Sequence, residues 1–421
     1  MDRISQLPDE LILRILSSLS TVDAVDTMLL SKRWQFLWTM VPKLVHDHTE
    51  YDDDEPAFSR SVERSLLLHD APTIKALHLK LGPDHSSKDI GLWIRPAERR
   101  CVRELVIEID SSSDNKSRVA LPKSLYTRCK MLVTLELSHA ALTDDVSSPI
   151  SFPYLKKLSL KYMKFPSGEF VDRLLSGCPV LEDLFVKQRR NDKVPILSVR
   201  MLHLKRLVLR TSEKRDEDEA SGFVIDAPSL ESLDIVNDCK GFCVIANDMS
   251  KIVSANVVMT RPHTEHILGS LTSAKRLHIC LPTTKNAYLA GSVFCNLVFL
   301  KICTCGKEWS SLLMRVLSDA PLLQSLKLEQ CHDLKDNEPR LNWSEPSSVP
   351  ECLLSSLKTL KWVNYRGTQE EKGVAAFILR SANCLGNVTI NPKSNSRRKF
   401  KMVKELSFLP RRSPTCQLVF D

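Results

Sequence analysis

The chain is poor in glycine, with 12 residues among 421. This scarcity leaves little material for the glycine-rich loops that cradle phosphates, and neither a P-loop nor a Gly-x-Gly-x-x-Gly motif occurs. The nucleophile elbow Gly-x-Ser-x-Gly and the zinc motif His-Glu-x-x-His are missing as well. These absences disfavour nucleotide-dependent and hydrolytic enzymes, so we expect no catalytic residue and no cofactor.

Long apolar runs are also missing. No stretch of about eighteen apolar residues occurs, so the sequence predicts no membrane-spanning helix. The first residues, Met1 to Ser5, lack the apolar core of a secretory signal. We therefore expect a soluble protein of the cytoplasm, the nucleus or both, with no membrane partner.

The 13 cysteines show no disulfide framework, because they are scattered and odd in number. The candidates for a metal site are Cys239, Cys243, the Cys303-Thr304-Cys305 triplet and the Cys331-His332 pair. Only one of these intervals is tight, and none repeats as Cys-x-x-Cys. The sequence therefore favours buried, reduced cysteines and predicts no metal.

What the sequence does contain is a recurring figure, apolar-x-x-apolar-x-apolar, between Ile74 and Ile390. Clear copies are Leu132-Leu135-Leu137, Leu155-Leu158-Leu160, Leu181-Leu184-Val186, Leu204-Leu207-Leu209, Leu230-Leu233-Ile235, Leu297-Leu300-Ile302 and Leu323-Leu326-Leu328. The central residues of successive figures from Leu135 to Leu326 are 22, 23 or 26 residues apart. This period is typical of a leucine-rich-repeat solenoid, in which each unit adds one short strand and stacking buries the apolar faces.

The predicted fold class is therefore α/β, a curved solenoid with parallel strands on its concave face. Apolar residues recur at three- and four-residue spacing in 170–179 and 312–321, which predicts helical returns there. Other units return through Phe152-Pro153 or Ala227-Pro228, where we expect only turns. Such an array indicates binding rather than catalysis.

Between the apolar positions, alternate residues face the opening of the array. On three successive strands these positions carry the cations Lys157, Lys161, Lys187, Arg206 and Arg210. One hypothesis is a patch for an acidic or phosphorylated protein substrate. The alternative is that the cations only keep an exposed sheet soluble and discourage edge pairing, and the mixed charges of later strands favour it.

The first 45 residues have a helical period instead. Helix starts are expected at Leu7-Pro8-Asp9-Glu10, at a capping box over Ser20–Asp23, and at Ser31. Three short helices cannot bury all of their large apolar side chains internally. The excess should form a surface for a partner.

These residues resemble a known motif. Leu7-Pro8-Asp9-Glu10-Leu11-Ile12 and Leu30-Ser31-Lys32-Arg33-Trp34, with Leu37-Trp38, resemble an F-box. Near the other end, Trp343-Ser344-Glu345-Pro346, the stretch Val349 to Leu353 and the ending Ser413 to Phe420 resemble an FBD module. With the repeats between them, the whole chain resembles the plant F-box/FBD/LRR-repeat family.

The resemblance implies four segments: an N-terminal three-helix F-box over 1–45, a linker over 46–70, leucine-rich repeats over 71–342, and an FBD module over 343–421 that continues or caps the repeats. His46 and His48 fall in this linker, and we expect them to be solvated.

The family's function would be substrate recognition in a Skp-cullin-F-box E3 ubiquitin ligase. The F-box would bind a Skp-like adaptor and, through it, the cullin and RING subunits, while the repeats would hold a protein substrate of unknown identity. The family's adaptor-contact pattern falls on Leu7, Pro8, Ile12, Ile15, Leu16, Val25, Leu29 and Trp34. The alternative is a protein-interaction scaffold that uses the same F-box and repeats outside ubiquitination.

The charge of +8 is concentrated at the end of the chain, since 391–421 holds eight basic and two acidic residues, a net of +6. The cluster Arg397-Arg398-Lys399-Phe400-Lys401 fits a nuclear import signal, although a solvated turn between two strands is the favoured interpretation. Nucleic acid is disfavoured as a partner, because few aromatic residues besides Phe185 and Phe400 interleave with the cations.

Overall fold

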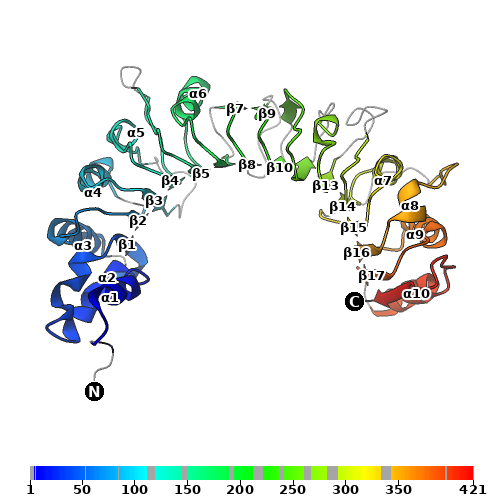
Figure 1. Ribbon diagram of the computed structural model, residues 1–421, viewed down its shortest axis with the longest axis horizontal. Helices are drawn as coiled ribbons and strands as arrows, with labels where there is room; N and C mark the ends of the chain where they lie inside the picture. The colour runs from blue at the N-terminus through cyan, green and yellow to red at the C-terminus, as the bar shows by residue number, and fades with distance from the viewer. Residues whose placement is uncertain are drawn as a thin grey trace. The chain divides into compact units, whose positions relative to one another are not determined.

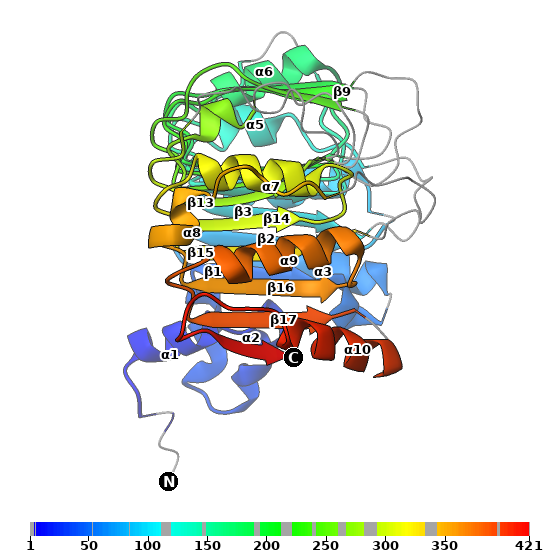
Figure 2. The same ribbon diagram turned by 90° about the vertical axis from the view of Figure 1, so that its right-hand side faces the viewer.

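The computed structural model describes the chain except for residues 1–3, 5, 53, 84, 111–118, 145–148, 189–193, 212–220, 238–240, 260–266, 282–292, 333–342, 394–395 and 421. The chain forms two compact units, Met1–Leu197 and Ser198–Asp421. Each unit is built on parallel strands that follow the chain order, with helices between some of the successive strands (Figure 1; Figure 2).

The first unit begins with a small helical module. It consists of α1 (Asp9–Leu16), α2 (Thr21–Asp26) and the 3₁₀ helices η1 (Thr27–Leu29) and η2 (Trp34–Met40). The side chain of Ser20 caps α2 by accepting a hydrogen bond from the Asp23 amide at 3.2 Å, which is one half of the predicted capping box. The third expected helix is a 3₁₀ helix, and its three aromatic residues Trp34, Phe36 and Trp38 have low α-helical propensity.

The rest of the first unit is a parallel sheet with helices on one side (Figure 1). Its strands are β1 (Lys43–Asp47), β2 (Ala76–Leu81), β3 (Glu104–Ile109), β4 (Thr134–Ser138), β5 (Lys157–Lys161) and β6 (Asp183–Lys187). Its helices are η3 (His48–Tyr51), α3 (Glu55–Leu68), α4 (Ser87–Arg99), α5 (Ser124–Arg128) and α6 (Gly168–Ser176). The central leucines of the repeat figure are aligned in register, as Leu135 with Leu158 and Leu158 with Leu184.

Residues 46–70 are part of the first repeat, so the prediction of a linker there is wrong. Strand β1 pairs with β2 and places His46 opposite Leu79, which turns the imidazole into the core. His46 is fully buried and His48 is half-buried, so neither is a solvated linker residue. Helix α3 then covers the sheet with Phe58, Val62 and Leu66.

The second unit continues the same pattern. Its parallel strands are β8 (Arg206–Arg210), β10 (Ser232–Asn237), β12 (Ser254–Met259), β13 (Arg276–Cys280), β14 (Phe299–Cys303), β15 (Ser325–Glu329), β16 (Thr359–Tyr365), β17 (Asn387–Pro392) and β18 (Gln417–Phe420). Its helices are η4 (Gly269–Leu271), α7 (Trp309–Ser318), α8 (Glu351–Ser355), α9 (Gln369–Ser381) and α10 (Ser396–Ser407). Helices α6 and α7 confirm the two predicted helical returns.

Three further strands were not predicted. They are β7 (Ile196–Arg200), β9 (Ser221–Asp226) and β11 (Gly241–Ile245), and they form a separate sheet in the order β11-β9-β7. The expected turn at Ala227-Pro228 is present, but strand β9 precedes it within the same return. Phe223 and Ile225 are buried whereas Val224 and Asp226 are only partly buried, a period that suits a strand rather than a helix.

The C-terminal segment extends the repeat sheet, because β16 and β17 pair in the register of the preceding strands. Helix α9 starts with a full capping box between Thr368 and Glu371. The basic cluster at 397–401 lies on α10, so the favoured interpretation of a turn between two strands is wrong. Leu406, further along α10, is buried.

Among the described residues, no helix combines the length and the apolar character that crossing a bilayer requires.

Candidate functional site

The helical module has its own small core. It contains Ile12, Leu16, Ala24, Trp34, Trp38 and Val41, each at most 6% exposed. Ile12 and Leu16 are four residues apart, so they share the inner face of α1. Three of the eight predicted adaptor contacts, Ile12, Leu16 and Trp34, are therefore core residues that a partner does not reach in this conformation.

The other five predicted contacts lie nearer the surface. Leu7 and Val25 are half-buried against the module core, and Pro8 is exposed. Ile15 is 45% exposed and Leu29 is 88% exposed. The prediction did not include Leu11, Leu30, Phe36 and Met40, which are also exposed. The helical period was the available signal, because Leu11 lies four residues before Ile15 on the outer face of α1.

Exposed apolar side chains are concentrated in this module. Among the described residues, seven of the 25 exposed large apolar side chains fall within residues 4–40, which is about a tenth of the chain. Groups of exposed apolar side chains on soluble proteins mark interaction sites more often than isolated ones do. Charged groups flank them, since the Arg33 guanidinium lies 2.5 Å from the Asp9 carboxylate and links η2 to the start of α1. The module therefore exposes several large apolar side chains with charged groups among them, which suits a protein partner.

Polar contacts attach the module to the first repeats. The Val45 amide of β1 donates to Thr21 Oγ1 at 2.8 Å, and the amide of Asp70 donates to the Thr39 carbonyl at 2.9 Å. Buried His69 adds a third contact, with Nε2 2.7 Å from the Val41 carbonyl. Arg100 donates to His69 Nδ1 at 2.7 Å, so Nε2 carries the proton and donates.

Burial is the main cause that lowers the pKa of His69, and the nearby Arg100 adds to it. The ring is therefore expected to stay neutral at physiological pH.

The predicted cationic patch divides between the two units. In the first unit, Lys157 and Lys161 on β5 lie 2.6 and 4.0 Å from Glu136, and Lys187 Nζ lies 4.6 Å from the centre of the Tyr162 ring. In the second unit, Arg206 and Arg210 lie on β8. The Arg210 guanidinium lies 2.9 Å from Asp234, whose other oxygen accepts a hydrogen bond from Asn256.

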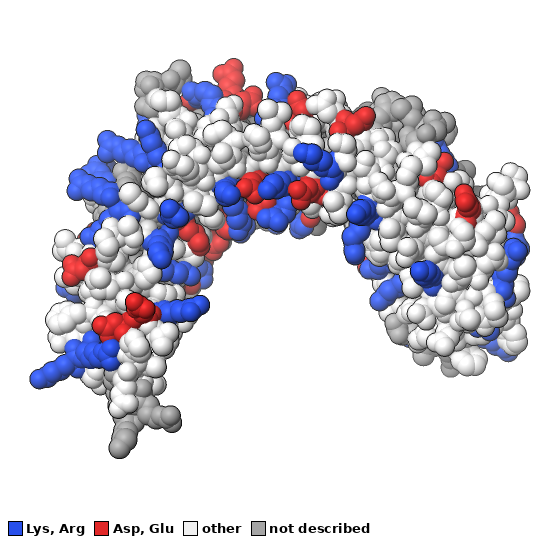
Figure 3. Space-filling view, in the orientation of Figure 1, with Lys and Arg blue, Asp and Glu red and all other residues white. Residues whose placement is uncertain are grey.

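The strand faces thus carry compensated rather than uniformly positive charge. Figure 3 shows acidic side chains intermingled with the basic ones. The same pattern recurs on β14 and β15, where Lys301 and Lys327 lie 2.8 and 2.6 Å from Glu329. Although partial burial opposes it, these two lysines lower the pKa of Glu329. A partner on these faces would meet charges of both signs.

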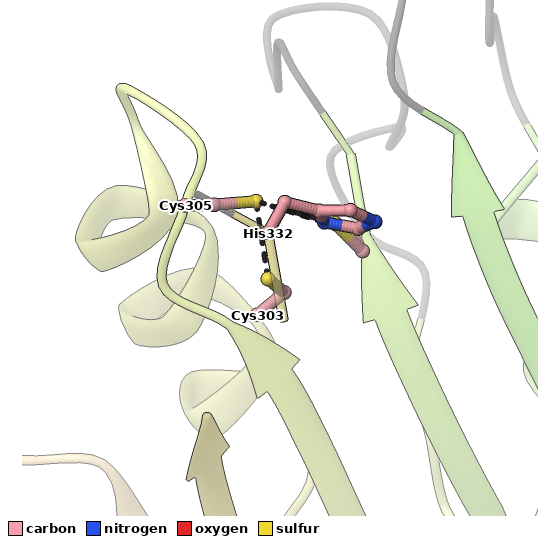
Figure 4. A group of neighbouring side chains, drawn as sticks. Cys303, Cys305 and His332 are labelled. Atoms are coloured by element: carbon pink, nitrogen blue, oxygen red, sulfur yellow. Dashed lines mark hydrogen bonds between the residues drawn. The ribbon is translucent and has the colours of Figure 1, made fainter. Parts of the chain in front are cut away.

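The structure brings together several cysteines that the sequence leaves scattered. Cys303, Cys305 and His332 converge with Cys280, and their ligand atoms all lie within 4.8 Å of one another (Figure 4). Cys331 lies beside this group, whereas buried Cys243 lies on β11 of the other sheet. Cys239 lies outside the described residues. The Cys280, Cys305 and Cys331 thiols, in that order of influence, lower the pKa of Cys303.

Comparison with known proteins identifies three segments. A model of the F-box domain matches residues 4–46, a model described as LRR repeats of the FBD-associated F-box protein At5g56370 matches 90–260, and the FBD model matches 345–390.

Whole-length relatives come from Arabidopsis thaliana. Probable FBD-associated F-box protein At1g32375 is 55% identical over 423 residues, with all of both chains covered. F-box/FBD/LRR-repeat protein At5g56420 is 44% identical over 424 residues, with 100% of this chain and 99% of the relative covered. F-box/FBD/LRR-repeat protein At4g26340 is 41% identical over 425 residues, again with both chains fully covered.

Proposed function

The chain belongs to the plant F-box/FBD/LRR-repeat family, and on that premise we propose that it is the substrate-recognition subunit of a Skp-cullin-F-box E3 ubiquitin ligase. The N-terminal module would bind a Skp-like adaptor and, through it, the cullin and RING subunits. The repeats would hold a protein substrate. Ubiquitin transfer would belong to the other subunits, so this chain would act without a catalytic residue or cofactor, in the cytoplasm, the nucleus or both.

The observation that carries the adaptor assignment is the concentration of exposed apolar side chains on the module. We define the adaptor surface as Pro8, Leu11, Ile15, Leu29, Leu30, Phe36 and Met40. Leu7 and Val25 would line its edge, because they are only half-buried. Ile12, Leu16 and Trp34 would support it from within. A partner that covers Leu29 and Phe36 would remove a large apolar area from water, which is the main source of affinity at such interfaces.

The strand faces of the repeats are the proposed substrate surface. Lys157, Lys161, Lys187, Arg206 and Arg210 would contribute its cations, and Glu136 and Asp234 would contribute acids beside them. Because these charges are already paired in part, a substrate would have to replace existing ion pairs. Replacing existing ion pairs adds little affinity but favours specificity, because a substrate whose charges do not match would leave charged side chains of the repeats unpaired.

A binding measurement with purified adaptor tests the proposal. Leu29→Asp combined with Phe36→Asp should weaken the affinity for a Skp-like adaptor by about a hundredfold or more, because two anchors become charged. Leu202→Asp is the matched control, since Leu202 is 70% exposed but lies in the second unit. Unchanged adaptor binding in the double variant, with the fold intact by circular dichroism, would remove the assignment.

The scaffold alternative predicts the same adaptor binding. It differs in the next step, because a scaffold outside ubiquitination does not require a cullin. Purification of the chain together with its adaptor, followed by a search for the cullin, separates the two functions.

A further inference from the structure

Three thiols and one imidazole converge in the second unit. Cys305 Sγ lies 3.1 Å from Cys303 Sγ and 3.4 Å from Cys280 Sγ. His332 Nδ1 lies 3.6 Å from the sulfur atoms of both Cys280 and Cys305. Figure 4 shows Cys303, Cys305 and His332 side by side, with contacts from Cys305 to the other two. The four residues come from three segments of the chain, around Cys280, Cys303–Cys305 and His332, which the fold brings together.

The group lies at the ends of neighbouring strands. Cys280 and Cys303 are the last residues of β13 and β14, Cys305 lies in the turn after β14, and His332 follows β15. Cys280 and Cys303 are buried, and Cys305 and His332 are partly buried. Hydrophobic neighbours enclose the sulfur atoms, with Val258 buried beside them and Val236 packed against them. The site is thus mostly shielded from water and spans three successive repeats.

Surrounding hydrogen bonds hold the groups in place. The Cys331 amide is directed at Cys303 Sγ, at 3.3 Å. The Gln330 side chain donates to the His332 carbonyl at 3.0 Å, and the Asn364 side chain donates to the Gln330 carbonyl at 3.1 Å. Amide donors that point at a cysteine sulfur stabilise the thiolate form, and metal sites rely on such supporting contacts.

We propose that Cys280, Cys303, Cys305 and His332 form a structural Zn²⁺ site. At ordinary zinc–sulfur and zinc–nitrogen lengths of about 2.3 and 2.0 Å, the ligands of a tetrahedral site lie about 3.5–3.8 Å apart. Four of the six separations between these atoms are 3.1–3.6 Å, close to that spacing, and all six are within 4.8 Å. Three thiolates with one imidazole are a common zinc ligand set, and soft sulfur ligands disfavour magnesium and calcium.

Apolar packing alone, or a disulfide, would account for less of the arrangement. If the cysteines were packed only as small apolar residues beside Val258, an apolar side chain would fit next to them better than an imidazole. Instead, the His332 ring nitrogen faces two of the sulfur atoms. A disulfide between two of the thiols leaves the third thiol and His332 without a role. Zinc uses all four groups at once.

The site would be structural, because four protein ligands leave no open coordination position for a substrate. On binding, the three thiol protons pass to solvent and His332 coordinates through its neutral Nδ1. The ion would then link the ends of β13 and β14 to the loop after β15. Since repeats are stabilised by contacts between neighbours, such a link would strengthen the array where it lies.

Metal analysis of the full-length chain tests the proposal. The chain is purified without chelator, and zinc is measured by inductively coupled plasma mass spectrometry. We expect about one zinc per chain, and its loss in Cys305→Ser and His332→Ala. Cys295→Ser is the control, because Cys295 is an exposed cysteine of the same unit that lies outside the group. His332 is only partly buried, so His332→Ala is expected to keep the fold, which circular dichroism checks.

Cobalt supplies a second readout of the ligands. Replacement of zinc by Co²⁺ should give the intense visible bands of a tetrahedral site and a thiolate charge-transfer band in the near ultraviolet, both absent in Cys305→Ser. Zinc that persists in both ligand variants would overturn the proposal. So would a different bound metal, a chain that takes up no zinc when zinc is supplied to its reduced form, or a native disulfide among Cys280, Cys303 and Cys305 found by mass spectrometry.

Discussion

At the scale of single residues, His46 shows how a polar side chain occupies an apolar position of the repeat. Its Nε2 lies 2.9 Å from Ser65 Oγ, and that hydroxyl donates to the Val62 carbonyl. Nε2 therefore carries the proton and donates to Ser65. Burial lowers the pKa of His46 to about 4. The first repeat thus depends on a neutral imidazole.

This burial predicts a loss of stability in weak acid. The unfolded chain binds a proton at the ordinary pKa of about 6.5 while the folded chain does not, so stability falls as pH drops from 6.5 toward 4. At pH 5 the shifted pKa of His46 lowers the free energy of unfolding by about 2 kcal/mol relative to pH 7. Melting temperatures of wild type and His46→Gln at pH 7 and pH 5 provide the test. If wild type and variant lost equal stability between pH 7 and pH 5, His46 would not be the group that causes the loss.

Leu184 and Lys187 on β6 test the inward and outward assignments. Leu184 is buried in the repeat core, so Leu184→Ala should destabilise the fold by about 2–5 kcal/mol through a cavity. Lys187 only contacts the Tyr162 ring from the surface, so Lys187→Ala should cost at most about 1 kcal/mol. Denaturant unfolding measures both. A larger effect at Lys187 would contradict the assignment of the two faces.

The sequence predicts the core leucines well because their period is short and repeated. It names Cys303, Cys305 and His332 among its metal candidates but does not group them and misses Cys280, since the three segments are far apart along the chain. One signal was available: Cys280 and Cys303 each lie three residues after the central leucine of their figure, Leu277 and Leu300. Residues at equal positions in successive repeats become neighbours, as these strands do in the pairing of β13 with β14.

At the scale of elements, the second and third apolar residues of each clear copy of the repeat figure lie on a strand of the structure. The sequence did not predict the strands that carry no copy of this repeat figure. In β1 the third position of the figure is His46 rather than an aliphatic residue, and β18 follows a looser pattern. Strands β7, β9 and β11 form outside the repeat sheet, where no recurring figure marks them. Periodicity thus predicts the repeated element and not the variable return between repeats.

The helical module shows a similar limit. Its apolar pattern predicts a partner surface but does not separate the residues that fill the core from those that face outward. The predicted contacts Trp34 and Leu29 illustrate this, since Trp34 is 3% exposed and Leu29 is 88% exposed. With so few residues, a change in helix type is enough to reverse which side chains point inward.

Trp34 and Leu29 therefore make different predictions. Trp34→Ala should destabilise the module by about 3–5 kcal/mol, and adaptor binding should fall because the module unfolds. Leu29→Ala should leave its stability within about 0.5 kcal/mol of wild type while weakening the adaptor complex. Hydrogen exchange of the module and calorimetric titration with adaptor separate the two effects. Protection unchanged by Trp34→Ala would contradict its place in the core.

At the scale of the whole molecule, the proposed function divides two tasks between different parts of one chain. The module lies in the first unit, and the strand faces proposed for the substrate extend through the repeats. Contacts such as Val45 to Thr21 attach the module to the first repeat. Because the two surfaces use different residues, a variant in one surface is expected to leave the other surface functional.

Charge reversal tests this separation. Lys161→Glu combined with Arg206→Glu should reduce the capture of the substrate and leave adaptor binding unchanged. Capture by the wild type should also weaken as salt rises, because exposed charges are screened over about 8 Å near physiological ionic strength. Quantitative mass spectrometry of captured proteins measures both effects. An identical set of captured proteins in the variant would leave these cations as solubilising charges.

The central claim is that this chain brings a substrate to a ubiquitin ligase. The most direct measurement is affinity capture from plant cells of the full-length chain and of the Leu29→Asp, Phe36→Asp variant. We predict that the wild type recovers the Skp-like adaptor and the cullin together, and that the variant loses both but still holds substrate. Recovery of the adaptor without any cullin, or of the cullin with the variant, would contradict the claim.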